Sequence, residues 1–209
     1  MASPRPSKRY VAVAGTLGAG KTSLVAWLVS RYGFRPFYEP NEDNPYLADF
    51  YRDMKRWALH SQLFFLAHKI RLHQEIALAE GPVVIDRTLY EDAEIFARNL
   101  HRQRILDKRD FGVYMTLYES IRGSLRPPDL LIALTCSLRA TKRRIRSRGR
   151  PMEAEIPDAY LRRLHELYEE WFEAYDLSPI VRIDTTSLDY VEDLVALIEL
   201  QDRLDKALA

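Results

Sequence analysis

The chain has 209 residues, 47% of them hydrophobic and 29% charged, and this balance excludes a wholly disordered protein. Its 31 basic and 30 acidic residues give a net charge of +1, so the overall charge predicts neither a nucleic-acid nor a membrane partner. The single cysteine excludes an internal disulfide, and with an N-terminus that has no apolar signal segment it predicts a cytoplasmic location. We expect one domain over residues 1–209, with residues 1–8 flexible.

Short runs of β-branched and other apolar residues alternate with longer segments of helical periodicity. The short runs predict strands at residues 10–14, 36–39, 83–86, 130–134 and 180–184. The longer segments predict helices at residues 21–32, 45–80 (as two helices), 89–104, 110–125, 138–147, 157–175 and 188–204. Strands that alternate with helices of this length are typical of parallel sheets, because parallel pairing needs long crossovers. The sequence therefore predicts an α/β fold with a five-stranded parallel sheet and helices on both faces.

A glycine-rich segment after the first strand matches the phosphate-loop pattern G-x-x-x-x-G-K-[ST] at every position. A predicted strand precedes it and a predicted helix follows it, which is the context that the pattern requires. The glycines let backbone N–H groups approach phosphate, Lys21 can neutralise the β- and γ-phosphates, and Thr22 can offer its hydroxyl to Mg²⁺. We therefore predict that a nucleoside triphosphate binds to Gly15, Thr16, Leu17, Gly18, Ala19, Gly20, Lys21 and Thr22.

Acidic residues follow the second and third predicted strands, at the edge where ligands of open α/β sheets bind. Glu39 could accept a proton from an attacking hydroxyl, although its position alone is better explained by a surface glutamate beside a proline turn. Asp86 ends an apolar strand, where P-loop enzymes carry the carboxylate that organises Mg²⁺. The adjacent Arg87 could serve a phosphoryl group or a substrate hydroxyl, and a strand-end ion pair is the structural alternative.

Positions 139–150 hold seven basic residues and no acidic residue. They could form a nucleic-acid surface, a solvated helix face paired with the acidic segment 166–173, or a lid over phosphates. The balanced net charge and the absence of interleaved aromatic residues disfavour nucleic acid. One guanidinium group can bind two phosphate oxygens at once, which suits a lid over phosphates. Gly149 is expected to end the helix, so Arg150 lies beyond it. We favour a lid at residues 144–156 that carries Arg144, Arg148 and Arg150, with Arg139, Lys142, Arg143 and Arg146 as solvated charges.

Polar side chains interrupt the otherwise apolar helix at residues 57–70. Gln62 and Lys69 project from one face two turns apart, and a buried amide or ammonium group needs a partner. On the next predicted helix, Asp92 and Phe96 place an acid and an aromatic ring on one face. These four side chains could bind a nucleobase, and polar residues satisfied within a helix bundle are the equally weighted alternative.

Five motifs, in this order, resemble the deoxyribonucleoside kinases, and most closely the bacterial purine deoxynucleoside kinases. They are the phosphate loop, Glu39-Pro40, Phe50-Tyr51 with Trp57 and Gln62, Asp86-Arg87-Thr88 with Asp92 and Phe96, and the arginine-rich residues 144–153. The resemblance implies a P-loop kinase fold with strand order 2-3-1-4-5. It also implies transfer of the γ-phosphate of ATP, with Mg²⁺, to the 5′-hydroxyl of a deoxynucleoside.

The resemblance also implies a role for each matched position. Glu39 would be the general base, and Arg87 would hold both Glu39 and the 5′-hydroxyl. Tyr51 and Glu153 would grip the sugar 3′-hydroxyl. Gln62 would pair with the base, Phe96 would stack on it, and Trp57 would pack near the sugar and base. The charge of the phosphates would be cancelled by Lys21, Arg148 and Arg150, with Arg144 beside them.

Departures from the family pattern affect the metal and the base. Many relatives have Glu-Arg-Ser where this chain has Asp86-Arg87-Thr88, so its carboxylate is one carbon shorter. Relatives that use purines or cytidine have an acid at the position of Asp92, often with an arginine at the position of Lys69. Lys69 keeps the positive charge of that arginine but lacks its forked guanidinium group. We expect purine deoxynucleosides first, with deoxyadenosine slightly ahead of deoxyguanosine, then deoxycytidine, and thymidine last.

The family also implies a homodimer, for which we expect the helices at residues 89–104 and 110–125 to form the interface. Two other functions compete with a deoxynucleoside kinase. A nucleoside monophosphate kinase of the thymidylate type shares the Asp-Arg pair but needs further basic residues for its acceptor's phosphate. A non-catalytic P-loop subunit is disfavoured because Lys21, Thr22, Glu39 and Arg87 are all retained.

Overall fold

The computed structural model describes residues 10–38, 43–150, 153, 156–187 and 194–208. Its centre is a sheet of parallel strands in the order β2-β3-β1-β4-β5, as predicted. The segment 1–8, expected to be flexible, and the predicted base Glu39 lie outside the described residues. The strands are β1 (Tyr10–Gly15), β2 (Arg35–Phe37), β3 (Val83–Asp86), β4 (Leu130–Thr135) and β5 (Ile180–Asp184).

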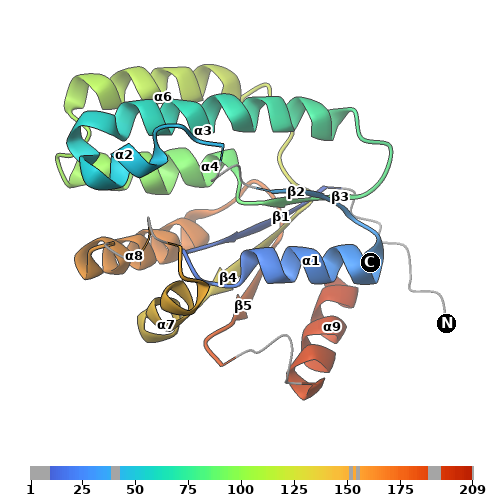
Figure 1. Cartoon of the computed structure of the whole chain (residues 1–209). Helices are drawn as coiled ribbons and strands as arrows, with labels where there is room; N and C mark the ends of the chain where they lie inside the picture. Colours follow the sequence, from blue (N-terminus) through green and yellow to red (C-terminus); the bar gives the residue numbers. More distant parts are fainter. Residues whose placement is uncertain (1–9, 39–42, 151–152, 154–155, 188–193, 209) are drawn as a thin grey trace.

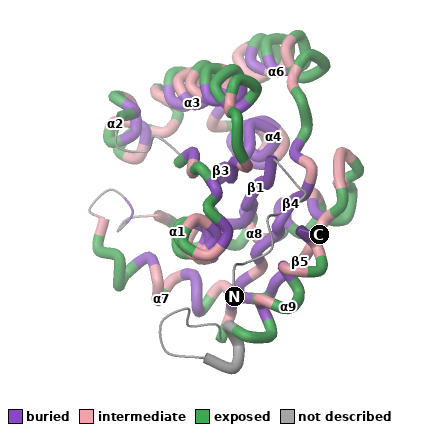
Figure 2. The backbone as a smooth tube through the Cα atoms, turned by 90° about the vertical axis from the view of Figure 1, so that its right-hand side faces the viewer, coloured by how far each residue is buried: buried purple, intermediate pink, exposed green. Residues whose placement is uncertain are grey.

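Helices cover both faces of this sheet, and its central strands β1 and β3 are buried throughout. In Figure 1, α1 and α9 lie on one side of the sheet and α3 and α6 on the other. Alternate residues of β1 face these two layers: Ala12 joins one core cluster and Val13 the other. This two-sided burial explains why the strand sequences are continuous apolar runs. Figure 2 shows the buried strands at the centre and the exposed outer surface of α6.

The helices follow the predicted segments closely. The segment 45–80 forms two helices, and Asp53 separates them by accepting a hydrogen bond from the Arg56 backbone N–H at 3.2 Å. Gly149 adopts a left-handed φ of 66° and ends α7, as its position predicted. Residues 188–193 of the last predicted helix lie outside the described part. The helices named here are α1 (Lys21–Tyr32), α2 (Leu47–Arg52), α3 (Met54–Ala77), α6 (Lys108–Arg122), α7 (Leu138–Arg148), α8 (Asp158–Ala174) and α9 (Leu194–Leu208).

The predicted helix at residues 89–104 differs from a regular α-helix. It begins as α4 (Leu89–Glu91), continues as a π-helical segment η1 (Asp92–Ala97) and ends as α5 (Arg98–Arg102). A π-helix has an extra residue per turn and occurs often at functional sites. Here Ile95 packs in the core, Asp92 lines a cavity, and Phe96 belongs to both.

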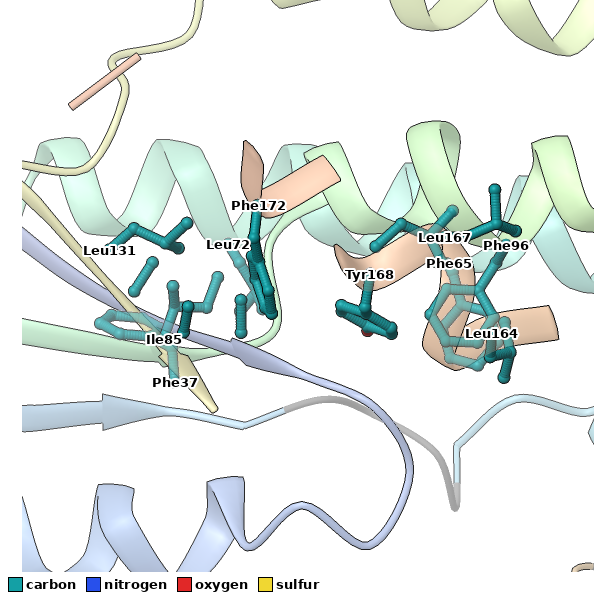
Figure 3. Close-up of a cluster of buried hydrophobic side chains, with 14 of the residues drawn as sticks. Phe37, Phe65, Leu72, Ile85, Phe96, Leu131, Leu164, Leu167, Tyr168 and Phe172 are labelled. Atoms are coloured by element: carbon teal, nitrogen blue, oxygen red, sulfur yellow. The ribbon is translucent and has the colours of Figure 1, made fainter. Parts of the chain in front are cut away.

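The larger apolar core lies on the face of the sheet that α3 covers, and residues of α8 and η1 complete it. Figure 3 shows Leu72 of α3 and Leu131 of β4 near Phe172, with Tyr168 beside it and Phe65, Phe96 and Leu164 further along the same layer. Because Phe65 and Phe96 belong to both this core and the cavity lining, the cavity wall is part of the packed interior. In the described part of the chain, no helix combines the length and apolarity needed to cross a membrane.

Candidate active site

The phosphate loop connects the end of β1 to the start of α1. A Cβ on Gly15 would lie 2.6 Å from the Leu134 carbonyl oxygen, and the φ of Gly15 is +153°, so only glycine fits there. Gly18 has a left-handed φ of 72° and passes close to the backbone of Thr141 on α7. The loop is therefore held tightly between β4 and α7, with the amino end of α1 behind it.

Lys21 and Thr22, the last residues of the loop motif, lie at the mouth of a cavity. The Lys21 ammonium group donates to the carbonyl oxygens of Gly15 at 2.9 Å and Thr16 at 3.1 Å, which holds its charge over the loop. The Thr22 hydroxyl donates to Asp86 Oδ2 at 2.7 Å. The sequence assigned both Thr22 and Asp86 to Mg²⁺. They lie together because Asp86 ends β3 and Thr22 follows the loop that leaves the neighbouring strand β1.

One cavity of about 560 Å³ extends from this loop to the space between α2, α3, η1 and the amino end of α8. That volume is within the range of small-molecule sites. It is lined by predicted residues and by others that the sequence did not single out. The predicted ones are Leu17, Gly18, Lys21, Thr22, Tyr51, Gln62, Asp86, Arg87, Asp92, Phe96, Arg148, Arg150 and Glu153.

Arg87 lines the cavity and has an unusual backbone conformation. Its φ is +68°, a left-handed value that costs energy for a residue with a Cβ. The backbone of the turn is held from two sides: the Arg87 N–H donates to the Val13 carbonyl at 3.0 Å, and Lys69 Nζ donates to the Arg87 carbonyl at 2.5 Å. The Arg87 guanidinium carbon lies 4.4 Å from the centre of the Phe96 ring. Such strain at a cavity wall is typical of functional residues.

The end of the cavity farther along α3 combines apolar and polar groups. Gln62 is 5% exposed, and its buried Oε1 accepts no hydrogen bond from the described residues. Asp92 is 3% exposed and Phe96 is 9% exposed on the opposite wall. A buried amide, a buried carboxylate and an aromatic ring around one space can bind a flat polar heterocycle.

The predicted lid places two arginines on one carboxylate. Arg148 forms an ion pair with Glu153, and Arg150 Nη1 lies 3.6 Å from the other oxygen of Glu153. All three side chains line the cavity. The lid residues 151–152 and 154–155 lie outside the described part of the chain.

Four predicted residues of the phosphate loop, Gly15, Thr16, Ala19 and Gly20, do not line the cavity, and neither do three predicted residues from other segments. Arg144, one turn before Arg148 on α7, donates to the Gly18 carbonyl at 3.3 Å and to Thr185. It therefore links the phosphate loop to the segment that follows β5. Trp57 stacks on Tyr46 with ring centres 5.7 Å apart. Lys69 is fully buried and donates to the backbone carbonyls of Asp86 and Arg87. Because seven residues of α-helix span about 10 Å, the Lys69 side chain lies near the end of β3 and not beside Gln62.

We expect Lys69→Met to lower kcat about 10- to 100-fold and to change the nucleoside KM little, because two carbonyls of the Arg87 turn lose their donor. Lys55→Met, on the exposed part of the same helix, is the matched control. Steady-state kinetics and thermal unfolding of both variants make the test. A raised KM with an intact kcat would instead place the Lys69 ammonium on the base.

Sequence reasoning did not single out several residues of the site, among them Tyr160 and Glu91. Tyr160 of α8 lines the cavity, and burial raises its pKa to about 12, so its hydroxyl stays protonated and can donate. Glu91 lies behind the cavity wall with its carboxylate fully buried. The pattern Thr88-Leu-Tyr-Glu91 is a helix-capping box, and this signal could have located Glu91 from the sequence.

A phosphate loop on a parallel sheet of order 2-3-1-4-5, with Arg148 and Arg150 lining the same cavity, defines the chain as a P-loop kinase. The chain belongs to the deoxynucleoside kinase family, whose model matches residues 11–207. The chain is therefore a nucleoside kinase, which confirms the family, fold and enzyme class predicted from the motifs.

Individual relatives match most of the length of this chain. A deoxyadenosine/deoxycytidine kinase of Bacillus subtilis (strain 168) is 34% identical over 201 residues, covering 95% of this chain and 93% of the relative. A deoxyguanosine kinase of Lactobacillus acidophilus is 36% identical over 191 residues, covering 87% and 82%. The structure of deoxyadenosine kinase from M. mycoides with bound dATP superposes with a TM-score of 0.81 at 30% identity, covering 93% of this chain and 99% of that one.

Proposed function

We propose that the chain transfers the γ-phosphoryl group of ATP to the 5′-hydroxyl of a purine deoxynucleoside, with deoxyadenosine preferred. The observation that carries this proposal is that one cavity is lined both by the phosphate loop and by Gln62, Asp92 and Phe96. The names of the relatives, which include deoxyadenosine and deoxyguanosine kinases, support a purine substrate.

The base end fits adenine better than thymine on chemical grounds. The Gln62 amide can donate to one adenine ring nitrogen while its oxygen accepts from the exocyclic amine, but it can pair in the same way with a carbonyl oxygen and the N3–H of thymine, so the selection against thymine falls to Asp92. The Asp92 carboxylate can also accept from an exocyclic amine, but it would face a carbonyl oxygen on thymine. Phe96 supplies an aromatic surface for stacking.

The sugar and phosphates would lie between the base end and the loop. Tyr51 and Glu153 line this part of the cavity and are proposed to bind the 3′-hydroxyl. Once Glu153 binds a hydroxyl, Arg148 and Arg150 become available for the phosphates of ATP. We propose that these two arginines and Lys21 cancel the charge that spreads over the phosphoryl group in the transition state.

The residues beside the loop suit Mg²⁺. Asp86 Oδ2 accepts from the Thr22 hydroxyl, while Asp86 Oδ1 is buried and accepts no hydrogen bond from the described residues. A carboxylate and a hydroxyl, completed by phosphate oxygens and water, are the ligands that Mg²⁺ prefers in phosphotransferases. We propose that Thr22 and Asp86 hold Mg²⁺, in part through water, and that the ion neutralises the β- and γ-phosphates when bound.

In the proposed reaction the 5′-oxygen forms a bond to the γ-phosphorus while the bond from that phosphorus to the β–γ bridging oxygen breaks. ADP leaves, and the hydroxyl proton goes to a base. Glu39 is proposed as that base on the resemblance alone. Arg87, which projects into the cavity between the two ends, is proposed to bind the 5′-oxygen. Because ATP supplies the phosphate and Cys136 is a free thiol, we propose that the chain works in the cytoplasm.

Phosphate transfer from ATP and Mg²⁺ to each of the four deoxynucleosides and to thymidine monophosphate tests the proposal. We expect a 5′-monophosphate product, fastest from deoxyadenosine. Turnover of thymidine monophosphate alone would instead identify a kinase of the thymidylate type. Binding of ATP without turnover of any acceptor would identify a non-catalytic subunit.

We also propose a homodimer that forms through α6. Val113 and Leu117 on this helix are 52% and 44% exposed, and large exposed apolar side chains often mark an interface. The other segment expected at the interface, 89–104, packs inside its own chain, where Leu89 and Leu100 are buried. We expect Val113→Glu with Leu117→Glu to convert a dimer to a monomer in light scattering. A dimer that survives both substitutions would contradict this interface.

A further inference from the structure

Glu91 is a fully buried carboxylate that does not line the cavity but lies directly behind its wall. Its Oε1 accepts from the Gly15 backbone N–H at 3.3 Å and from the Tyr168 hydroxyl at 2.9 Å. Its Oε2 accepts from the Thr88 backbone N–H at 2.7 Å and the Thr88 hydroxyl at 3.0 Å. Each oxygen of this carboxylate thus accepts from two donors, and a buried polar network that is satisfied in this way is rigid.

The donors come from three separate parts of the fold. Gly15 is the first residue of the phosphate loop, Thr88 follows Arg87 at the end of β3, and Tyr168 belongs to α8. Gly15 and Tyr168 are 76 and 77 residues from Glu91 in the chain, so these contacts exist only in the folded protein. The capping box with Thr88 fixes the start of α4 and thereby the position of Glu91 itself. This carboxylate therefore ties the phosphate loop to the Arg87 turn and to α8.

The charge of Glu91 also matters to the cavity. Arg87 Nε lies 3.9 Å from Glu91 Oε1, and both side chains are nearly inaccessible to solvent. Burial raises the pKa of the Glu91 carboxyl, and the positive charge of Arg87, the Thr88 N–H and the positive charge of Lys21 oppose that effect. The two cations that face the phosphates thus share one buried counter-charge, which reduces their mutual repulsion.

We propose that Glu91 is a positioning residue for phosphoryl transfer. It fixes the position of the Arg87 guanidinium relative to Gly15, the first residue of the phosphate loop, and Tyr168 acts through Glu91. This inference rests on the proposed function, because a fixed relation between acceptor-side and donor-side groups matters only when both bind in this cavity. Its effect is largest in the transition state, where Arg87 and the loop act on the same phosphoryl group.

The first test compares Glu91→Gln with Glu94→Gln. Glu94 lies three residues further on, pairs with Arg98 at 2.7 Å and is not part of the cavity lining, so it controls for the loss of one carboxylate from this segment. We expect Glu91→Gln to lower kcat about 10- to 100-fold at a temperature well below unfolding, with the deoxyadenosine KM changed less than about threefold. Glu94→Gln should retain its kcat. A merely structural Glu91 would lower the unfolding temperature and leave kcat intact, which would overturn the proposal.

A second variant keeps the proposal testable if Glu91→Gln fails to fold. Tyr168→Phe removes one donor to Glu91 and preserves the ring that packs on Phe96 and Phe172. We expect its kcat to fall about threefold to tenfold. Where both variants fold, Tyr168→Phe should add no further loss to Glu91→Gln, since Tyr168 acts through the carboxylate. An unchanged kcat in Tyr168→Phe, or full additivity, would contradict this part of the inference.

Titration of ADP with Mg²⁺ separates this inference from the proposed function. If the wild-type chain phosphorylates no deoxynucleoside, the proposed function fails, but the loop must still bind ADP. We then expect Glu91→Gln to weaken ADP binding about fivefold relative to both Glu94→Gln and the wild type, because the loop has lost its anchor at Gly15. Equal ADP affinities in that case would overturn the inference as well.

Discussion

Replacing Arg87 with methionine is expected to lower kcat about 1,000-fold or more, the largest loss among the cavity residues. Its guanidinium lies over Phe96, beside the buried Glu91, and is only 6% exposed, so little water replaces it when it is removed. Arg87→Lys keeps the charge but not the planar fork, and we expect it to recover only part of the rate. Steady-state kinetics with saturating ATP and deoxyadenosine measure both variants.

The control for this prediction is Arg98→Lys, on the same helical segment. Arg98 is paired with Glu94 and belongs to no part of the cavity lining, so its kcat should stay within about twofold of the wild type. A kcat for Arg87→Met within about tenfold of the wild type would contradict a direct role for Arg87 in the transfer.

Replacing Asp92 with alanine is expected to change the base preference by about 1,000-fold in total. The carboxylate is 3% exposed at the base end of the cavity, where it can accept from the amine of adenine and repel the carbonyl of thymine. We expect kcat/KM for deoxyadenosine to fall about 100-fold and that for thymidine to rise about tenfold, because buried polar groups discriminate strongly between hydrogen-bonding partners. Competition between the two nucleosides in one reaction gives the ratio directly.

An exposed carboxylate on α9 offers a matched control for that substitution. Asp202→Ala should leave the preference unchanged. If Asp92→Ala lowers kcat/KM for both nucleosides by the same factor, the carboxylate serves the fold of η1 and does not select the base.

The sequence predicted the sheet and the loop because their signals are local. The apolar runs of β1 and β3 are buried on both faces, so their composition alone marks them as parallel strands. The phosphate-loop motif is continuous, and Thr22 and Asp86 meet because adjacent parallel strands end at the same edge. The order of the strands came from the resemblance, since the pattern of residues does not encode it.

Long-range geometry was beyond the sequence. The π-helical segment η1 and the left-handed backbone of Arg87 depend on tertiary contacts with β1, α3 and α8. Lys69 shares a helical face with Gln62, yet its side chain reaches the carbonyls of the Arg87 turn, because two helical turns separate the residues. Arg144 likewise lies one turn closer to the sheet than Arg148 and reaches Gly18. Glu91 was missed because two of the three segments that it joins, those of Gly15 and Tyr168, are distant in sequence.

The central claim is that one cavity holds both the phosphates and the acceptor nucleoside. A molecule in which deoxyadenosine is joined through its 5′-oxygen and a chain of phosphates to adenosine tests it most directly by calorimetric titration. We predict one molecule bound per chain, with affinity lowered more than about tenfold by Lys21→Met at the loop and by Gln62→Leu at the base end. An affinity that is unchanged by Gln62→Leu would contradict the claim, because the nucleoside end would then lie elsewhere.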